Sequence, residues 1–308
     1  DYAFDIKADY GGFSGGLNYI QKQTTTATLN KSAGTIYRDY GTFWNIRFIN
    51  GYIKYNGILS ENIKLSSIIY NRNSTVLDNT IYHVTDTGRV GYYRPNNLIG
   101  IENILDYSYS GNFSVAGGIT LEFESLAKGF SISKSNSIDV NPPAPPKPNM
   151  LNNRLASIFI EPKITFLKDL YLSGGLRYDN STVYDDVVTP RIGLSYNVLS
   201  YILRITYAEA FRAPKPWDYN DGLGNPALKP ERMRSFEVSV AGVLSENLRF
   251  SVAGYINRLK NAIIKEEYID GYKWTNSGEA NTEGIETWLR LRYGNFSANM
   301  SYTYTNST

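Results

Sequence analysis

The sequence predicts an all-β fold, an antiparallel up-and-down transmembrane β-barrel of the outer-membrane type. Three observations lead to this prediction. Apolar and polar residues alternate through most of the chain, the alternating segments run to about ten or more residues, and their connections are alternately short and long. A period of two is typical of a strand with two different faces, and a tilted strand needs about 9–11 residues to cross a bilayer.

One face is apolar and the other polar in each alternating segment. The segment NFSVAGGITLEFES places Phe113 and Phe123 on one face and Glu122 on the other. The same arrangement recurs in residues 170–179, 285–293 and 296–304. Counting such segments gives about fourteen strands. In lipid every backbone N–H and C=O must be paired, so a sheet crosses only as a closed barrel, with its apolar face toward the membrane and its polar face toward the lumen.

The connections predict how the strands are arranged. The short ones fall at residues 59–62, 111–112, 168–169, 199–200, 245–247 and 294–295. The long ones fall at about residues 24–42, 74–96, 125–152, 180–188, 210–234 and 259–282. In a meander alternate connections lie at the same end, so tight turns should occupy one end and long loops the other, as in outer-membrane barrels. The alternative is a soluble β-sandwich. Strands of soluble proteins average about 5–6 residues, so the longer segments of this sequence favour the membrane barrel.

Composition excludes several classes of function. The net charge of +2 gives no reason to expect nucleic-acid binding, and the absence of cysteine excludes a thiolate metal site or a cysteine nucleophile. His83 is the single histidine, which excludes a multi-histidine metal site within this sequence. Asp185 and Asp186 supply too few oxygens for calcium, which takes about 6–8. We therefore predict no catalytic residue, no metal site and no cofactor.

The segment from Phe211 to Glu231 reads FRAPKPWDYNDGLGNPALKPE and holds four of the 12 prolines. Proline cannot donate to a sheet ladder, so regular pairing should end near Pro214, and Gly222 permits a turn. We predict a stiff rim loop here, with the return strand starting at Ser235. The residues assigned to this rim structure are Phe211, Arg212, Pro214, Asn225, Pro226, Pro230 and Glu231.

Aromatic and charged side chains in the predicted loops are the candidate ligand contacts, because aromatic faces with a few fixed polar groups suit a small-molecule site. The candidates are Trp217, Asp218, Tyr219 and Asp221 in the rim loop, Tyr92, Tyr93 and Arg94 in GYYRP, and Tyr272 and Trp274 in GYKW. Alternatively, the last two clusters only pack the loops together. The proline-rich stretch NPPAPPKPN, residues 141–149, is expected to be an extended, mobile spacer.

Several stretches resemble a known family. FRAPKPWDYNDGLGNPALKPE followed by SFEVSV resembles the signature region of TonB-dependent outer-membrane receptors. EPKITFLKDLYLSGGLRYDNSTVYDDVVTPRIGLSYN is similar to that family's strand pair with a GLRYD-type and a PR-type motif, and WTNSGEANTEGIETWLRLRYG resembles its Gly-Ile-Glu strand. The resemblance covers about residues 150–308, whereas residues 1–149 fit the barrel pattern without a specific motif.

The resemblance implies a plugged barrel of about 22 strands in the outer membrane of a Gram-negative bacterium. Residues 1–308 would be part of the barrel domain, and we expect the sequence to be an interior fragment of a longer protein. It implies a monomer, surrounded by outer-membrane lipid, that imports a scarce small-molecule nutrient with energy from the TonB complex, delivered through a plug domain missing here. The expected ligand is a ferric siderophore. Cobalamin, a nickel complex and an oligosaccharide remain open, whereas the lack of histidine in residues 212–224 disfavours haem.

Two other functions are considered. One is a passive channel or surface-binding barrel without energy coupling, which needs the same alternating strands. The other is an enzyme within a barrel, for which the sequence contains no catalytic constellation. The polar-face positions include Arg177, Arg191, Arg204, Arg249, Arg290 and Arg292, with Glu237 and Glu286 nearby in the pattern. These arginines could guide an anionic ligand, but we expect them to form salt bridges of the barrel and contacts with the plug, because a lumen is polar in any case.

Overall fold

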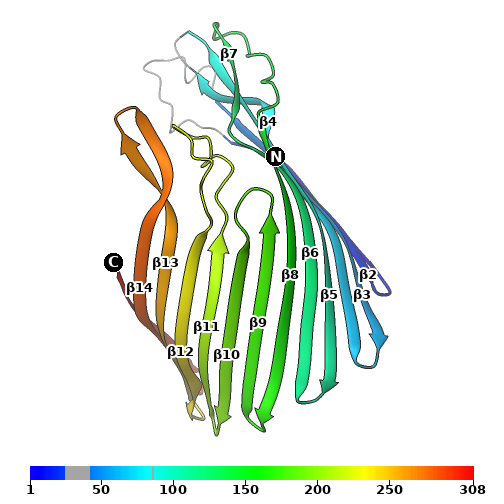
Figure 1. The fold of residues 1–308 in the computed structure, drawn as a ribbon, viewed down its shortest axis with the longest axis vertical. Helices are drawn as coiled ribbons and strands as arrows, with labels where there is room; N and C mark the ends of the chain where they lie inside the picture. The colour runs from blue at the N-terminus through cyan, green and yellow to red at the C-terminus, as the bar shows by residue number, and fades with distance from the viewer. Residues whose placement is uncertain (25–41, 85–86) are drawn as a thin grey trace.

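The computed structural model describes residues 1–24, 42–84 and 87–308. These residues form fifteen strands of one antiparallel sheet, without a helix (Figure 1). The strands are β1 (Tyr2–Tyr10), β2 (Phe13–Thr24), β3 (Trp44–Ser60), β4 (Ile63–Val84), β5 (Arg89–Ser110), β6 (Phe113–Ala127), β7 (Ser131–Ser135), β8 (Met150–Leu167), β9 (Leu170–Ser181), β10 (Val187–Val198), β11 (Tyr201–Arg212), β12 (Glu231–Ser245), β13 (Leu248–Tyr268), β14 (Gly271–Tyr293) and β15 (Phe296–Ser307).

The strands follow one another as an up-and-down meander. Each pairs with its sequence neighbours, except that β7 pairs with β5 and lets β6 pair with β8. β1 and β15 lie at the two edges of the curved sheet, which is open (Figure 1). The predicted all-β fold of the outer-membrane barrel type is confirmed, as an incomplete barrel. Nowhere in the described ranges does a helix occur that could span a membrane.

The register keeps apolar and polar residues on separate faces across many strands. Leu194 of β10 lies opposite Ile205 of β11, which lies opposite Val238 of β12. One residue away, Ser195 lies opposite Arg204. The apolar face is the more open one, since even mid-strand residues such as Val238 are 46% exposed. The apolar face therefore has no protein core against it, as expected for a surface that meets lipid.

Seven tight turns of the described residues lie at one end of the sheet, here called the turn end, and the longer connections lie at the other, called the loop end (Figure 1). The loop end also has one two-residue turn, Ile269–Asp270, at the tip of the extended β13–β14 hairpin. The six predicted short turns are confirmed, and a seventh occurs at Gly11–Gly12. The buried apolar side chains of the described residues gather at the loop end. They are Val76, Ile81, Val84, Ala127, Val187, Tyr219 and Leu228. Among the described residues, a globular type of core therefore forms at the loop end.

Several predicted loop boundaries are wrong, because strand pairing continues beyond the barrel. Most of residues 74–96 and 259–282 belong to the hairpins β4–β5 and β13–β14, and residues 125–152 contain the additional strand β7. Bulges in both hairpins shift the period of two and disguise the strands. β12 begins at Glu231 and not at Ser235. The predicted connection at 24–42 falls almost entirely outside the described residues.

Candidate ligand site at the loop end

The rim loop, residues 213–230, leaves the sheet where the prolines begin. β11 ends at Arg212, and the following residues form a turn in which the backbone N–H of Asp221 donates to the carbonyl of Trp217 at 2.8 Å. The Asp218 carboxylate accepts the backbone N–H of Lys215 at 3.0 Å and thus caps the turn. Gly222, with φ of 63°, reverses the chain, and an added Cβ there would lie 2.3 Å from the carbonyl oxygen of Tyr272. The predicted stiff loop is therefore tightly packed against its neighbour.

An ion pair closes the base of the rim loop. Arg212 and Glu231 lie opposite each other in the β11–β12 ladder, and the guanidinium binds the carboxylate through both Nε and Nη2, the second at 2.7 Å. The same carboxylate accepts the backbone N–H of Ile263 in β13 at 2.7 Å. Glu231 is only 5% exposed. These two residues, assigned from sequence to the rim structure, tie together three strands beneath the loop.

Asp221 joins the rim loop to the β13–β14 hairpin. Its carboxylate accepts the Tyr272 hydroxyl at 2.9 Å and the Trp274 indole Nε1 at 3.0 Å. This hydrogen bond raises the pKa of Tyr272, which also lies under the ammonium of Lys265 at 3.9 Å. Asn225, a rim residue, donates to the carbonyl of Trp274 at 2.8 Å. Three of the nine candidate ligand residues thus contact one another and hold two loops together.

Arg94 joins the rim loop to the β4–β5 hairpin. Its guanidinium lies 4.3 Å from the ring centroid of Trp217 and 5.2 Å from that of Phe130. Tyr92 stacks on Tyr82 with centroids 4.3 Å apart, and packs against Phe130 at 5.1 Å. Burial lowers the pKa of Arg94, and its Nε is buried without a hydrogen-bond partner among the described residues. Arg94 therefore lies against aromatic rings from two different connections.

A hollow of about 950 Å³ opens between these connections. The residues that give it its chemical character are Arg94, Lys128, Phe130, Lys147, Trp217 and Asp221. Three of them are cations and two are aromatic. The single carboxylate among the lining residues, Asp221, is already engaged by Tyr272 and Trp274. The hollow therefore presents excess positive charge beside flat aromatic surfaces.

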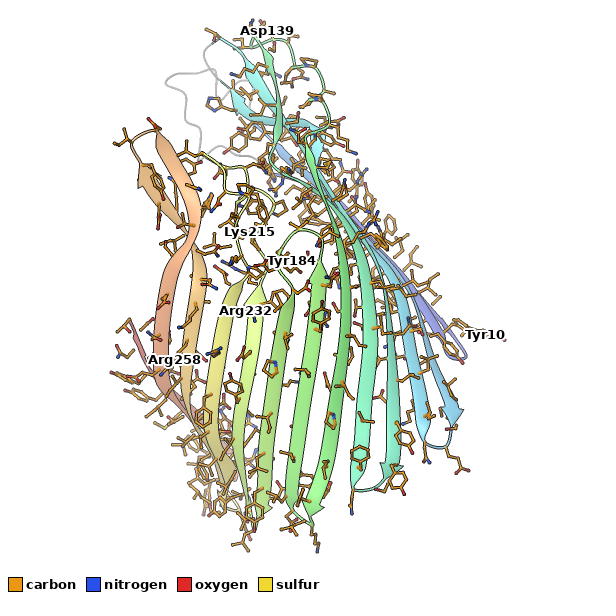
Figure 2. All side chains as sticks on the ribbon, viewed as in Figure 1. Tyr10, Asp139, Tyr184, Lys215, Arg232 and Arg258 are labelled. Carbon is orange, nitrogen blue, oxygen red and sulfur yellow. The ribbon has the colours of Figure 1, made fainter. Side chains whose placement is uncertain are left out.

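The remaining candidates lie away from the hollow. Asp218 and Tyr219 are 5% and 9% exposed, and burial raises the pKa of Tyr219 to about 12. The Tyr219 hydroxyl has no hydrogen-bond partner among the described residues. Tyr184, which Figure 2 labels at the loop end and which packs against Phe211 with ring centroids 6.1 Å apart, also has its pKa raised to about 12 by burial. Tyr93 alternates onto the opposite face of β5 from Tyr92 and Arg94.

Sequence reasoning missed part of the lining. Lys128 and Phe130 lie between β6 and β7, and Lys147 interrupts the proline-rich stretch that was expected to be a spacer. The two lysines could have indicated these lining residues in the sequence, because a spacer without a binding role does not require cations. Within the ranges that the structure describes, no cluster of three or more histidine and acidic residues could hold a metal. Asp186 instead accepts hydrogen bonds from Tyr178 and from Asn180.

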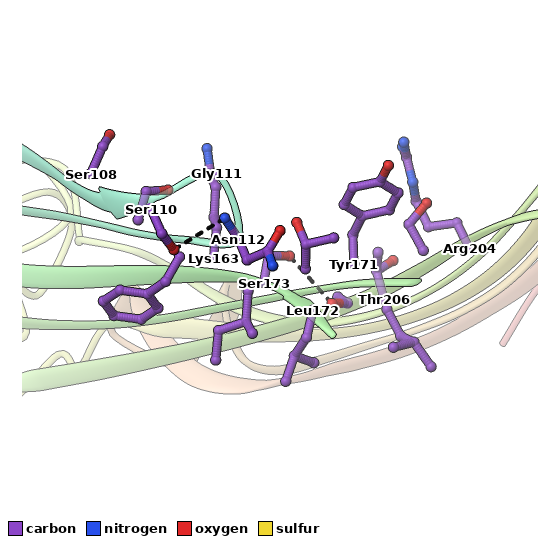
Figure 3. A pocket seen from close by; sticks show the side chains of 17 residues that line it. Ser108, Ser110, Gly111, Asn112, Lys163, Tyr171, Leu172, Ser173, Arg204 and Thr206 are labelled. Carbon is purple, nitrogen blue, oxygen red and sulfur yellow. Dashed lines mark hydrogen bonds between the residues drawn. The ribbon is translucent and has the colours of Figure 1, made fainter. Parts of the chain in front are cut away.

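The polar face carries two kinds of cation. Arg177 and Arg191 are paired, the first with Asp179 at 2.8 Å and the second with Glu161. Nearer the turn end, a hollow of about 600 Å³ is lined by Lys163 and Arg204, neither of which forms an ion pair with a described residue. Figure 3 shows Tyr171 and Arg204 projecting from one side of the sheet there and Leu172 from the other. The two faces thus remain distinct down to the turns.

The sequence matches the family described as "TonB dependent receptor-like, beta-barrel" over residues 1–308. The vitamin B12 transporter of Vibrio vulnificus (strain CMCP6) is 28% identical in sequence, and the matched region covers 45% of this chain and 28% of the transporter. The siderophore receptor PirA from Acinetobacter baumannii has a similar fold, with a TM-score of 0.70, 15% identity and coverage of 98% of this chain and 52% of its own. The alcaligin receptor FauA from Bordetella pertussis also has a similar fold. Its TM-score is 0.66 and its sequence identity 14%, and the match covers 99% of this chain and 52% of the FauA chain. This chain spans about half the length of these two solved structures and less of the transporter.

Proposed function

Because this chain belongs to the TonB-dependent receptor β-barrel family, whose members are Gram-negative outer-membrane transporters and receptors, we propose that the full-length protein imports an anionic ferric siderophore. Its barrel lies in the outer membrane, with the turn end toward the periplasm and the loop end outside the cell. Binding occurs at the loop end. The TonB complex supplies the energy for import through a plug domain. No covalent step is involved.

The observation that supports this proposal is the hollow lined by Arg94, Lys128, Lys147 and Trp217. A ferric catecholate carries net negative charge and exposes aromatic rings. Cations at the mouth of a partly desolvated hollow attract such an anion, and the ring of Trp217, already oriented by Arg94, offers a stacking surface. The carboxylate of Asp221 keeps its negative charge while it accepts hydrogen bonds from Tyr272 and Trp274, but the three cations of the lining outweigh it.

Binding is tested with the purified full-length receptor and three probes: a ferric triscatecholate, an uncharged ferric trihydroxamate, and cyanocobalamin. Quenching of tryptophan fluorescence should give the tightest binding for the triscatecholate. The double variant Arg94→Gln/Lys147→Gln should weaken it about tenfold or more, as loss of two charge contacts predicts. The matched control is Lys134→Gln, which removes a cation from the same region but not from the lining. Equal binding of all three probes, or preference for cyanocobalamin, contradicts the siderophore assignment.

Energy coupling is tested separately, by uptake of radioactive iron in whole cells. A receptor energised by TonB should stop accumulating iron when a protonophore collapses the inner-membrane potential or when TonB is deleted, while surface binding persists. Uptake that follows the external concentration and ignores both treatments would identify the passive channel.

A further inference from the structure

Four cationic side chains lie on the apolar face of the sheet, at its loop-end boundary. They are Arg232 and Arg234 of β12 and Arg258 and Lys260 of β13. On both strands the next residue of this face toward the turn end is a large apolar one, Phe236 in β12 and Ile256 in β13, which lie opposite each other. The change from lipid-facing to charged residues is therefore sharp and occurs at the same level on both strands.

The register of the two strands places these cations directly opposite one another. Arg232 pairs with Lys260, and Arg234 pairs with Arg258. Like charges directly opposite in an antiparallel pair are destabilising, since their Cβ atoms lie about 4.5–5.5 Å apart. The strands cannot escape by slipping one residue, because that would turn the apolar residues of one strand to the polar face. The sequence thus keeps an unfavourable arrangement that an external anion would relieve.

The acidic groups of the neighbouring strands neutralise only part of this charge. Glu209 of β11 forms an ion pair with Arg234 at 3.1 Å. On β14, Asn281 lies opposite Arg258, and Glu279 and Glu283 stand on either side of it without an ion pair to these cations. Across the described residues, Arg258, Lys260 and Arg232 have no ion-pair partner.

The surroundings of these cations indicate what kind of anion could bind them. Arg232 donates to the backbone carbonyl of Val188 at 3.4 Å, a long hydrogen bond that leaves most of its donors available. Arg258 and Lys260 are exposed. Arg232 lies at the start of β12, where the rim loop ends, and Figure 2 labels Arg258 below it along the sheet. The apolar face beside them meets acyl chains, so these cations lie at the depth of the lipid headgroups.

We propose that this cationic patch, Arg232, Arg234, Arg258 and Lys260, binds the phosphate groups of a phosphorylated lipid in the outer leaflet. A phosphate between two facing cations replaces repulsion by charge-assisted hydrogen bonds, and a guanidinium can bind it through two nitrogens at once. The ligand is a lipid and not soluble phosphate, because Phe236 and Ile256 directly below supply contact for its acyl chains.

The test is lipid retention by the full-length receptor, delipidated in detergent and offered bisphosphorylated lipid A or its dephosphorylated form. Native mass spectrometry counts the lipid bound per receptor. Wild type should retain the bisphosphorylated form about tenfold more strongly, from the charge-assisted contacts. Arg258→Gln/Lys260→Gln should lose most of that preference. The matched control Arg249→Gln/Arg290→Gln removes the same charge from a directly opposed pair of β13 and β14, on the polar face, and should behave like wild type.

Three results would overturn the proposal. The first is equal retention of the two lipids by wild type, which requires no variant and so does not depend on whether the variants fold. The second is an equal loss of preference in the test and control variants. The third is displacement of the bisphosphorylated lipid by inorganic phosphate at comparable concentration, which would identify an ion site in place of a lipid site.

Discussion

The carboxylate of Glu231 is buried whereas the guanidinium of its partner Arg212 is not: the side chains are 6% and 59% exposed. The two sides of this ion pair therefore do not contribute equally. Removing the exposed cation leaves a buried anion with only the backbone N–H of Ile263 as a described partner. Removing the buried anion leaves a cation that water can solvate.

We therefore predict that Arg212→Gln destabilises the receptor more than Glu231→Gln does. An uncompensated buried charge costs about 3 kcal/mol, whereas loss of a hydrogen bond whose partner remains solvated costs about 1 kcal/mol. Denaturation of the folded receptor by urea in detergent measures both changes. Equal destabilisation by the two substitutions would show that the burial of Glu231 does not determine the stability of the pair.

Asp221→Asn should release the rim loop from the β13–β14 hairpin, because an amide accepts the Tyr272 and Trp274 protons more weakly than a carboxylate does. The expected result is hydrogen exchange about tenfold faster at Leu223, whose backbone N–H donates to the Tyr272 carbonyl at 2.8 Å. Asp270→Asn at the hairpin tip makes the same chemical change without these contacts and serves as the control. Unchanged exchange in Asp221→Asn would mean that backbone pairing alone holds the two segments.

Trp217→Leu should weaken ligand binding and disorder Arg94, whereas Trp217→Phe should retain most of both, because a phenyl ring still offers a face to the guanidinium. A cation–π contact contributes about 0.5–2 kcal/mol, which corresponds to roughly a twofold to thirtyfold loss of affinity in the leucine variant. Binding titrations with the ferric triscatecholate measure it. If the two variants bind equally, the ring face at position 217 has no part in recognition.

Raising the pH should loosen the loop cluster between about pH 10 and 12. Burial raises the pKa of Tyr184 and Tyr219 to about 12, compared with about 10 in an unfolded chain. The folded state therefore holds these protons more tightly, so its stabilisation is complete below pH 10 and is lost as the pH rises toward 12. Phenolate absorbance should include groups that titrate near pH 12, and one of these should disappear in Tyr219→Phe. Titration of all tyrosines near pH 10 would contradict this.

The strands that cross the membrane could be predicted from sequence because their alternation is unbroken. Phe236, Val238 and Val240 repeat with a period of two, and the register confirms a single face. The extensions above the membrane could not be predicted in the same way. Between Val76 and Thr80 the ladder shifts register, so apolar residues change face and the pattern looks like a loop.

The candidate site was only partly predictable, for a different physical reason. Aromatic and charged residues in loops were identifiable from their types, and Arg94, Trp217 and Asp221 do lie around one hollow. The packing of separate loops determines which of these residues bind one another and which remain available to a ligand. No local pattern indicates that Asp218 caps its own turn or that Lys128 and Lys147 line the same hollow as Arg94.

The confinement of buried apolar side chains to the loop end has a consequence for how such a protein can diversify. A substitution at Leu228 or Val187 alters packing at the loop end, yet the hydrogen-bonded ladder of the membrane strands does not depend on that packing. Substitutions in the loop-end connections can therefore change ligand specificity without changing the strands that insert into the membrane. Recognition and membrane residence are, in this molecule, nearly independent mutational targets.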